Sequence, residues 1–416
     1  MKTIIPTKIL VAFGLALPWL AVNSAGSLAQ ESRVEGAKDA PPPTKILSID
    51  TWQKGLRADG LANLHRIMPN LMAVNAQDAF PLNYQAADYE LHEIPSVARL
   101  FRHPAVSALV VITKDGDVLL EHYKNGHNRN STFSDQSSTK SIGYILLNQA
   151  LKDGKVSLDD KVEKYLPKIG PGFRGRTVGE VAAMAVNHNV AELAAYTGDP
   201  KAVAMFDRDE RVIGLQRNDK RETMRQFVQE IEIAPGNESN EWKGKIANYA
   251  TINTSVLGLI LESATGVGLD DQVRRLLHRV GGQNTVYMGT DFDGLPMIGA
   301  SLLSSTVDFA RYGRLLIEDK NRALADRKKS KTDGQPVPAT LTHIESRYYK
   351  SAIHNDFGFG HSGWGGQLLW ADPDMGVIIA CNSQVNSKLP APYDHFNKLY
   401  EAAIDIVKHY RAERDK

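Results

Sequence analysis

The sequence predicts an α+β fold in which an antiparallel sheet is flanked by terminal helices and interrupted by an inserted, mostly helical lobe. Three observations predict it. Strand patterns lie at residues 107–123 and again from about Phe357, whereas helical patterns fill the middle of the chain. A long helical pattern also closes the chain at residues 393–414. Strands before the insertion can therefore pair with strands after it, and the cleft between the two parts is a natural place for a site.

Composition bounds the class of protein. The chain has 416 residues, 42% of them hydrophobic, and a formal net charge of +1. This is an ordinary globular composition, and the near-neutral charge gives no case for nucleic acid or a membrane surface as partner. The single cysteine, Cys381, excludes an internal disulfide, and its apolar surroundings (MGVIIACNSQ) predict a buried strand residue.

The first 29 residues have the pattern of a secretory signal peptide. Lys2 and Lys8 supply a basic start, an apolar stretch follows, and small residues end at Ala29, with Ala25 as the alternative cleavage point. No later stretch is long and apolar enough to cross a bilayer. We therefore expect a periplasmic or secreted protein with no stable membrane insertion after signal cleavage.

The rest of the chain is expected to form a linker and one domain. Residues 30–50 are charged and then proline-rich, as linkers are. Residues 51–416 form the domain, with an α/β part at about 90–135 and 340–416 and a helical part at about 150–335.

Individual elements follow from local signals. The hairpin at 107–123 has Asp-Gly in its turn, and GQLLWADPD with MGVIIACNSQ forms a second hairpin. Thr177 and Glu180 have the spacing of a helix capping box. Further predicted elements are a short helix within 51–72, a turn and short charged helix at 154–167, helices at 221–233, 254–264 and 306–318, a polar loop at 186–219, and a mobile exposed loop at 324–338.

The first candidate chemistry lies in residues 133–152 (FSDQSSTKSIGYILLNQALK). Ser137 and Lys140 stand three residues apart at the head of an expected amphipathic helix, so their side chains lie within reach of each other. A desolvated, neutral lysine can take the proton of a serine hydroxyl and make it a nucleophile. Because Ser-x-x-Lys is a short pattern, the alternative is a serine N-cap followed by a solvated lysine.

Tyr249 is the second candidate, in a polar turn before the helix at 254–264. A tyrosine hydroxyl held near a lysine ammonium loses its proton more easily. It could then act as general base toward Ser137 and as general acid toward the leaving group. The alternative is a tyrosine whose ring packs on the core while its hydroxyl reaches water.

The third stretch, residues 357–370 (FGFGHSGWGGQLLW), brings glycines and polar groups to a strand start. Its glycine spacing matches a dinucleotide-binding fingerprint, which we reject because that fingerprint follows a strand and opens a helix. Glycines here let a substrate approach closely. His361 and Ser362 offer polar groups before Gly363, and the N–H of Trp364 could form part of an oxyanion hole. The alternative is a β-bulge with an incidental histidine.

Together these stretches resemble the serine β-lactamase and penicillin-recognising superfamily, most closely its class C-like branch. That branch includes class C β-lactamases, DD-peptidases, D-aminopeptidases, β-lactamase-fold esterases and 6-aminohexanoate-dimer hydrolases. The motif S-x-x-K is similar to residues 137–140, Y-x-N or Y-x-S to 249–251, and K-T-G or H-T-G to 361–363. The motifs occur in the family's order, and the resemblance covers roughly residues 90–412.

The resemblance implies a β-lactamase-like fold and a role for each site residue. Ser137 would be the nucleophile, Lys140 would help to deprotonate it, and Tyr249 would be general acid/base. The backbone nitrogens of Ser137 and Trp364 would hold the oxyanion. The other substrate-binding residues would be His361, Ser362, Gly363 and Thr251. An acyl-enzyme on Ser137 would be released by water, with no metal and no cofactor.

Three departures from the family pattern bear on the substrate. His361 replaces a lysine whose fixed charge suits a substrate carboxylate, and a histidine is charged only in part near neutral pH. Thr251 replaces an asparagine, which removes an amide that could bind a substrate amide. The helix after Thr177 ends in MAVNHN, where the family often has a threonine-serine-glycine turn. Asn187 and His188 are candidates to line the cleft, although His188 fits an exposed loop equally well.

We therefore expect an exported serine hydrolase that cleaves a small ester or amide, and we do not expect efficient β-lactam hydrolysis. Two alternatives stay open. One is a DD-peptidase or D-aminopeptidase acting on peptidoglycan fragments, and the other is a penicillin-binding or sensor protein that is acylated without turnover. The sequence has no H-E-x-x-H and no G-x-S-x-G pattern, which argues against zinc peptidases and α/β-hydrolases.

Overall fold

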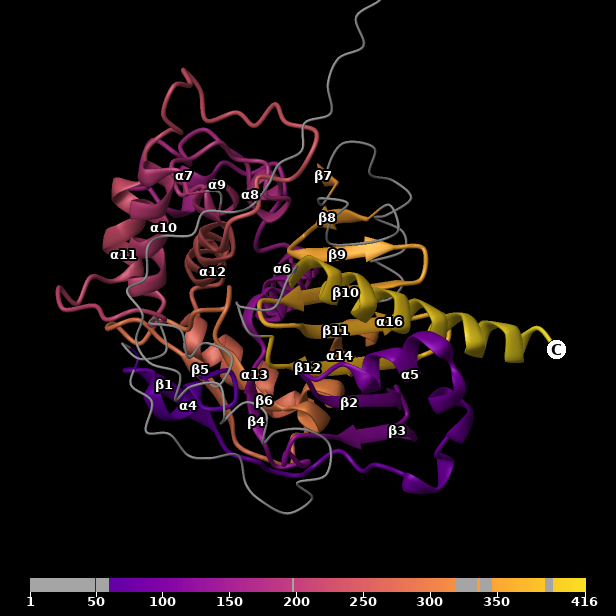
Figure 1. Ribbon diagram of the computed structural model, residues 1–416. Helices are drawn as coiled ribbons and strands as arrows, with labels where there is room; N and C mark the ends of the chain where they lie inside the picture. The colour runs from indigo at the N-terminus through magenta and orange to yellow at the C-terminus, as the bar shows by residue number, and fades with distance from the viewer. Residues whose placement is uncertain (1–48, 50–59, 197, 319–334, 337–345, 386–391) are drawn as a thin grey trace, which may run out of the picture.

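The computed structural model in Figure 1 describes most of the chain. The described residues are 49, 60–196, 198–318, 335–336, 346–385 and 392–416. The expected signal peptide (1–29) lies outside them. So do the linker (30–50) apart from residue 49, and the expected loop at 324–338 apart from residues 335–336.

An antiparallel sheet forms the larger part of the molecule. Its eight described strands run in the order β3-β2-β12-β11-β10-β9-β8-β7. Strand β2 pairs with β12 from the far end of the sequence, which confirms that strands before the insertion join strands after it. The strands are β2 (Val106–Thr113), β3 (Val118–Tyr123), β7 (Gln335–Pro336), β8 (Arg347–Tyr349), β9 (Ala352–Asn355), β10 (Gly358–Gly363), β11 (Gln367–Asp372) and β12 (Val377–Ser383).

Both predicted hairpins are present in this sheet, as β2–β3 and β11–β12. Alternate residues of each strand enter two different cores: Val110 belongs to one hydrophobic cluster and Leu109 and Val111 to the other. Because both faces are covered, the central strands β2 and β12 are largely apolar. Cys381 is buried in β12, as predicted, and burial raises the pKa of its thiol to about 12.

Helices cover the two faces of the sheet. Helix α5 (Pro95–Arg102) and the C-terminal helix α16 (Pro392–Arg414) pack together over one face, as Figure 1 shows in purple and yellow. Helix α14 (Thr306–Glu318) packs on β11 and β12 from the other side. Helix α6 (Ser141–Lys152) joins it there, with the Tyr144 ring 5.5 Å from that of Phe359. The α+β architecture flanked by terminal helices is confirmed.

A second sheet was not expected, and its strands lie below the helices of the lobe in Figure 1. Its order is β1-β5-β6-β4, and all of its strands are short. The strands are β1 (Leu71–Val74), β4 (Thr132–Ser134), β5 (Val286–Gly289) and β6 (Leu302–Ser305). Strand β4 ends just before η4 (Gln136–Lys140), so this sheet helps to position the turn that contains Ser137.

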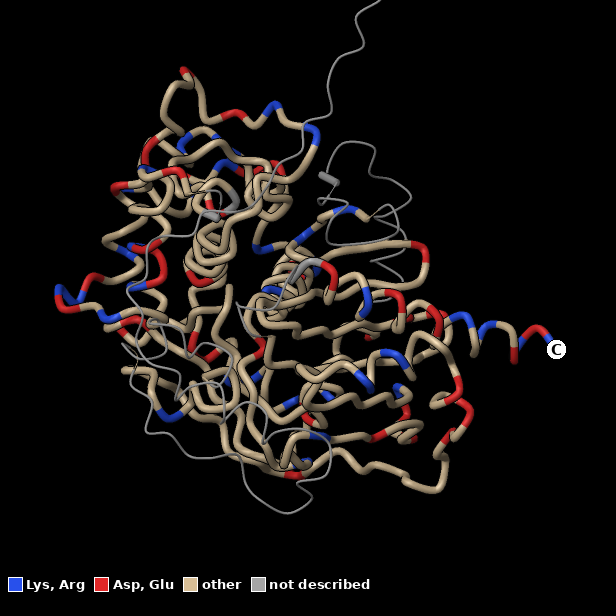
Figure 2. The backbone as a smooth tube through the Cα atoms, viewed as in Figure 1, with Lys and Arg blue, Asp and Glu red and all other residues tan. Residues whose placement is uncertain are grey.

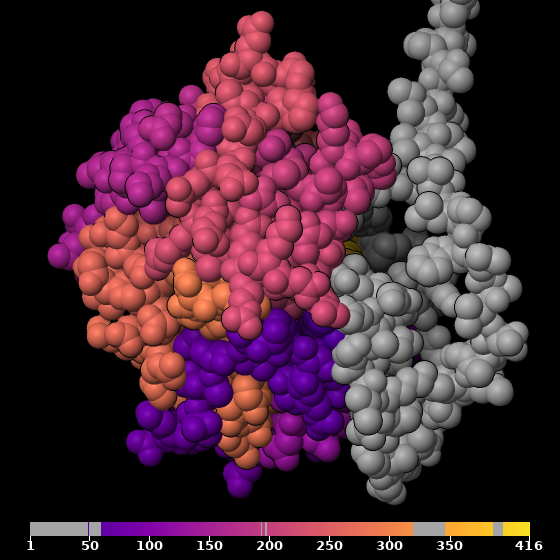
Figure 3. All heavy atoms as spheres, turned by 90° about the vertical axis from the view of Figure 1, so that its left-hand side faces the viewer, coloured from indigo at the N-terminus to yellow at the C-terminus, as the bar shows by residue number. Residues whose placement is uncertain are grey.

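The inserted lobe stands to the left of the large sheet in Figure 1. Its helices are α7 (Val162–Tyr165), α8 (Val178–Ala182), α9 (Glu192–Tyr196), α10 (Pro200–Val212), α11 (Met224–Phe227), α12 (Thr251–Thr265) and α13 (Leu269–Val280). In Figure 3 this lobe faces the viewer, with the rose segments above the indigo N-terminal residues. Short helices elsewhere are α4 (Leu64–Ile67), η2 (Tyr84–Ala86), η3 (Tyr89–Glu93), η4 (Gln136–Lys140) and η5 (Val228–Glu230).

Several local expectations are settled in this lobe. The capping box is present: Thr177 Oγ1 accepts from Glu180 N at 3.1 Å and Glu180 accepts from Thr177 N at 2.7 Å. The expected loop at 186–219 was wrong, because α9 and α10 form within it. The expected helix at 221–233 is only α11 and the turn η5. Helix α12 begins at Thr251, not 254, and is buried on all sides up to Leu261, so it is not amphipathic.

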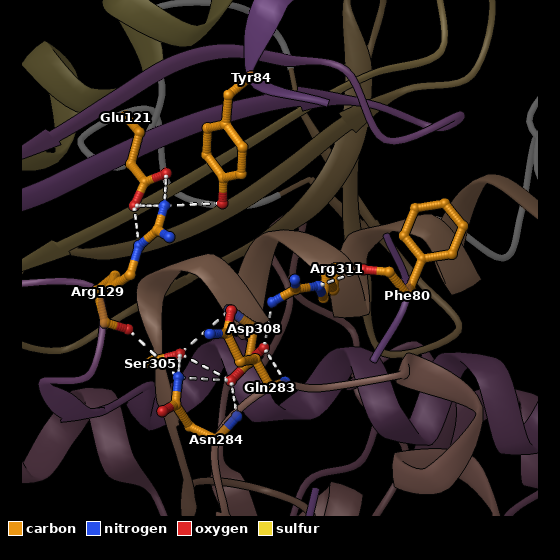
Figure 4. A network of polar contacts seen from close by, with 9 residues as sticks. All are labelled: Phe80, Tyr84, Glu121, Arg129, Gln283, Asn284, Ser305, Asp308 and Arg311. Atoms are coloured by element: carbon orange, nitrogen blue, oxygen red, sulfur yellow. Dashed lines mark hydrogen bonds and ion pairs between the residues drawn. The ribbon is translucent and has the colours of Figure 1, made fainter. Parts of the chain in front are cut away.

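A buried polar network ties α14 to its surroundings (Figure 4). Asp308 forms an ion pair of 2.7 Å with Arg311 and accepts the backbone N–H groups of Gln283 and Asn284, each at 2.8 Å. Ser305 at the end of β6 donates to the same carboxylate at 2.9 Å. This charge is therefore paired and fully hydrogen-bonded, as buried charges must be. The network fixes the junction between the small sheet and α14.

Charged residues of both signs are distributed along the described chain. In Figure 2 basic and acidic residues are interspersed along the outer helices and loops, and the central strands are mostly tan.

No single described helix combines the length and apolar character that would let it cross a membrane. Within the described part of the chain, one bent pair of helices, α12 and α13 at 98°, meets that criterion of length and composition when taken together.

Candidate active site

Ser137 and Lys140 meet on one turn of helix. They lie in η4, which runs directly into α6, and Lys140 Nζ is 3.0 Å from Ser137 Oγ. Lys140 has no exposed surface, whereas Ser137 is partly exposed. The structure thus brings the two predicted residues together, with the serine at the surface of the site and the lysine beneath it.

The alternative interpretation of residues 137–140, a serine N-cap followed by a solvated lysine, does not fit the structure. Lys140 is not solvated, and Ser137 is not an N-cap, because η4 is preceded by Asp135 in that position. Helix α6 is not amphipathic: it is buried on nearly every side. Gln136 has φ +48°, a left-handed conformation that strains a non-glycine residue, and its amide donates to Ser134 Oγ at 2.7 Å. Such strain beside a reactive group is typical of functional sites.

Lys140 has three polar neighbours in a buried environment. Besides Ser137, Nζ lies 3.0 Å from Thr251 Oγ1 and 2.8 Å from the carbonyl oxygen of Gly299. A Cβ atom at Gly299 would lie 2.7 Å from the Thr251 methyl group, so only glycine fits there. Burial lowers the pKa of Lys140 to about 8, although the negative charges of Glu192 and Asp209 oppose this shift. A neutral lysine is therefore accessible near physiological pH.

Tyr249 stands just before α12 and completes the group. Its side chain interacts with that of Ser137, and Lys140 Nζ lies 4.9 Å from the centre of its ring. Burial and the nearby charge of Glu192 raise the pKa of Tyr249 well above its usual value. The expectation that Lys140 would ease loss of the Tyr249 proton does not match this direction. Tyr249 is therefore available as a proton donor.

Strand β10 forms the opposite side of the site. It carries the predicted His361, Ser362 and Gly363, all of them buried. A Cβ atom at Gly363 would lie 2.4 Å from the carbonyl oxygen of Asp135, so the strand can approach the nucleophile turn only with glycine there. Trp364 follows in the turn after β10 and lines the same pocket as Ser137.

His361 is a neutral residue in this site. Its Nδ1–H donates to the carbonyl oxygen of Ser362 at 2.5 Å, which fixes the tautomer. Burial, together with the charge of Lys140, lowers the pKa of His361 to about 3. We had expected a histidine that is partly charged near neutral pH. Its burial removes the charge almost completely, so it does not replace the cation of the family lysine.

Glu192 is a site residue that the sequence did not reveal. It projects from α9, and its Oε2 accepts from Thr251 N at 2.8 Å and from Thr251 Oγ1 at 3.0 Å. It is 4% exposed. The only signal in the sequence is an isolated carboxylate within the apolar run VAELAA at 190–195, where a charge is out of place unless it has partners.

A small pocket opens above Ser137 between the two parts of the molecule. It is lined by Gln136, Ser137, Glu192, Phe206, Glu210, Ile213, Leu215, Thr251, Ala300 and Trp364. Asn187 does not line this pocket but a separate hollow formed with residues 236–239 and 241–244. His188 is fully buried and stacks on Phe173 at 4.8 Å, so the exposed loop position that we considered for it was wrong.

The buried carboxyl group of Asp135 supports the turn that contains Ser137. Asp135 accepts from Ser304 Oγ at 2.6 Å and from Asn382 Nδ2 at 3.1 Å. The Asn382 amide also donates to Gln367 Oε1 at 2.9 Å. Burial raises the pKa of Asp135 well above its usual value. Among the residues that the structure describes, no three or more histidine, cysteine or acidic side chains are placed to hold a metal ion.

Comparison with known proteins gives consistent matches. The sequence profile of the Beta-lactamase family matches residues 97–403. The 6-aminohexanoate-dimer hydrolase of Paenarthrobacter ureafaciens is 20% identical over 301 residues, covering 71% of this chain and 73% of that protein.

Two solved structures are similar in fold. A Bacillus anthracis protein described as "Putative 6-aminohexanoate-dimer hydrolase" superposes with a TM-score of 0.70 at 17% identity, covering 90% of this chain and 99% of its own. The D-amino acid amidase of Ochrobactrum anthropi SV3, complexed with D-phenylalanine, gives 0.55 at 16% identity, covering 77% and 98%.

Proposed function

The chain belongs to the β-lactamase family of serine hydrolases, and we propose on this basis that it hydrolyses a small ester or amide through an acyl-enzyme on Ser137. The observation that carries the proposal is the contact of 3.0 Å between Ser137 Oγ and the Nζ atom of the fully buried Lys140. A buried lysine with a pKa of about 8 can be neutral and can accept the serine proton.

Acylation follows from these positions. Lys140 takes the proton of Ser137 as Oγ attacks the substrate carbonyl and the new C–O bond forms. The backbone N–H groups of Ser137 and Trp364 would stabilise the negative charge on the carbonyl oxygen. Tyr249, which stays protonated, donates its proton to the leaving alcohol or amine as the scissile bond breaks, and then regains a proton from Lys140.

Deacylation reverses the proton transfers. A water molecule attacks the acyl carbonyl and gives up its proton to Lys140. Ser137 Oγ leaves and is protonated through Tyr249, which restores the starting state. Ser137, Lys140 and Tyr249 perform these transfers with their own groups, so the scheme contains no step that a metal or cofactor must supply.

The pocket supports neutral or cationic substrates over anionic ones. Glu192 and Glu210 are among its lining residues, and none of those lining residues is lysine, arginine or histidine. His361 is uncharged near neutral pH. A substrate carboxylate, as in a β-lactam, would therefore meet negative charge without a compensating cation.

The same carboxylates favour a second candidate function. A D-aminopeptidase substrate carries an ammonium group beside the scissile bond, and Glu192 and Glu210 could pair with it. The similar fold of a D-amino acid amidase is in keeping with this candidate.

We also propose export, on the basis of the pattern in residues 1–29. N-terminal sequencing of protein from a cell envelope fraction tests it, and an intact Lys2 would contradict it.

Time-resolved mass spectrometry tests the proposed function. The protein is mixed with a p-nitrophenyl ester, a β-lactam, a D-amino acid amide and a short ω-amino amide, and product release is followed in parallel. We expect a transient mass increase on the peptide that contains Ser137, and its loss together with turnover in Ser137→Ala.

The matched control and the contrary outcomes are distinct. The exposed serine variant Ser157→Ala should behave as wild type. A stable adduct without product would favour a sensor. Turnover that survives in Ser137→Ala would refute the assignment of the nucleophile.

A further inference from the structure

The hydrogen bonds of Thr251 have a fixed direction. Its backbone N–H and its hydroxyl both approach the same oxygen of Glu192, at 2.8 and 3.0 Å. An ionised carboxylate can only accept hydrogen bonds. The hydroxyl proton of Thr251 therefore points to Glu192, and the remaining lone pairs of Thr251 Oγ1 face Lys140 Nζ, 3.0 Å away.

The second partner of Lys140 is also an acceptor. The carbonyl oxygen of Gly299, at 2.8 Å, cannot donate a hydrogen bond. Two neighbours of Nζ thus each require an N–H group. A neutral amine has two N–H groups and one lone pair, and the Cε atom occupies its fourth tetrahedral position. The lone pair is left to face the third neighbour, Ser137 Oγ, at 3.0 Å.

We propose that Glu192 is a positioning residue: by holding the Thr251 hydroxyl as a donor, it turns the lone pair of neutral Lys140 toward Ser137. This inference rests on the proposed function. It also accounts for the threonine in the second motif. An asparagine oxygen is an acceptor by itself, whereas a threonine hydroxyl can turn its proton either way and needs a partner to fix it. Without Glu192, Thr251 could donate to the Lys140 lone pair and block it.

Charges from several elements act on Lys140. Glu192 on α9 and Asp209 on α10 favour its protonated form, while burial opposes it more strongly. Tyr249 before α12 and His361 on β10 also face it. Removing the charge of Glu192 should therefore lower the pKa of Lys140 further. Loss of charge and loss of orientation thus have separable effects: the first moves the midpoint of the pH profile, and the second lowers the rate at high pH.

The test measures how fast Ser137 reacts when Lys140 is neutral. A small alkyl fluorophosphonate is added to the folded enzyme from about pH 6 to about pH 10, and the adduct is counted by intact-protein mass. Ser137 Oγ bonds to phosphorus, fluoride leaves, and the serine proton goes to Lys140. In Glu192→Leu, which removes both the charge and the acceptor for the Thr251 hydroxyl, we expect the high-pH rate to fall roughly 10- to 100-fold. The midpoint should move to lower pH than in wild type.

Two further variants make the result specific. Glu262→Leu removes another carboxylate, which lies on α12 in a partly exposed ion pair with Arg225, and it should leave rate and midpoint unchanged. Thr251→Val removes the hydroxyl and should lower the high-pH rate. In that background Glu192→Leu should shift the midpoint without lowering the rate again, because no hydroxyl is left to orient. Thr251→Ser should restore the rate to within a few-fold of wild type.

The outcomes separate this inference from the proposed function. If the wild type is not labelled at Ser137, the proposed function fails and the inference fails with it. If the wild type is labelled but Glu192→Leu keeps the high-pH rate, or lowers it equally in the Thr251→Val background, the inference alone is overturned. Should Glu192→Leu not fold by circular dichroism, the comparison of Thr251→Val with Thr251→Ser decides, and equal rates would overturn the inference.

Discussion

Ser138 donates its hydroxyl proton to the carbonyl oxygen of His361 at 2.9 Å. The bond joins the residue after the nucleophile to strand β10, which lies far away in the sequence. Both groups are buried. It therefore sets the distance between the Ser137 turn and the strand that leads to Trp364, the two sources of the proposed oxyanion hole.

Removal of this link should affect catalysis more than stability. In Ser138→Ala we expect a loss of about 1 kcal/mol in the free energy of unfolding. We also expect kcat to fall roughly tenfold or more with KM little changed, because the two N–H groups lose their fixed spacing. Ser141→Ala is the matched control, since its buried hydroxyl binds the Ser138 carbonyl at 2.6 Å without touching β10. Equal losses of kcat in both variants would contradict this role.

The activity should depend on the protonation of Lys140. Burial lowers the pKa of Lys140 to about 8, and only the neutral amine can accept the serine proton. We expect kcat/KM for a p-nitrophenyl ester to rise with pH to a plateau, with a midpoint near pH 8. Lys140→Met should lose at least roughly a hundredfold in rate along with this midpoint. A midpoint near pH 6 in the wild type would instead implicate a histidine.

The same lysine should make stability depend on pH. Between about pH 8 and about pH 10.5 the unfolded chain keeps the Lys140 proton and the folded protein does not. The unfolded state binds more protons there, so the free energy of unfolding rises with pH. Relative to Lys140→Met, the wild type should gain on the order of 3 kcal/mol across this window. Denaturant titrations of both proteins measure it, and a flat difference would contradict the assigned pKa.

Substrate charge should be discriminated at the pocket. The p-nitrophenyl ester of butyrate should be hydrolysed with a kcat/KM at least roughly tenfold above that of the p-nitrophenyl monoester of succinate. His361 stays neutral until pH approaches about 3, so acidification to pH 6 should not narrow the difference in kcat/KM between the two esters. Glu210→Gln should narrow it by removing one lining carboxylate. A preference for the succinate ester would refute this account of the pocket.

The buried ion pair within α14 should make a large contribution to stability. Asp308 and Arg311 are both buried, and Asp308→Asn would leave the Arg311 charge unpaired. We expect a loss of about 3–5 kcal/mol in the free energy of unfolding, measured by denaturant titration. Lys164→Gln breaks a surface ion pair with Asp160 and should change the free energy of unfolding far less. Similar losses in the free energy of unfolding of the two variants would show that the buried Asp308 network stabilises the protein no more than a surface ion pair does.

The elements that were predictable from sequence are those fixed by local chemistry. Asp-Gly in the turn determined the β2–β3 hairpin, and Thr177 with Glu180 determined a capping box. The small sheet was missed because its strands contain only three or four residues and show no measurable alternation. Helix α9 was missed because its pairing with α10 and the burial of Glu192 depend on tertiary contacts that no local pattern contains.

The features of the candidate site can likewise be divided into those that local sequence predicted and those that depend on tertiary contacts. Ser137 and Lys140 stand on one helical turn, so their contact follows from spacing alone. Thr251 was assigned a place by motif, but its contact with Glu192 joins two separate elements and could not be derived from either. The protonation of Tyr249 and His361 was misjudged because it depends on burial, which the sequence does not specify for single polar residues.

The pairing of β2 with β12 has a consequence for synthesis. The nucleophile turn emerges from the ribosome early, yet β10, which must sit against it, and β12, which closes the sheet onto β2, emerge near the end. The sheet cannot close until nearly the whole chain is available, and such distant pairings form slowly. A nascent chain therefore carries Ser137 without Trp364, the second proposed oxyanion donor, and hydrolytic activity should appear only once translation is essentially finished.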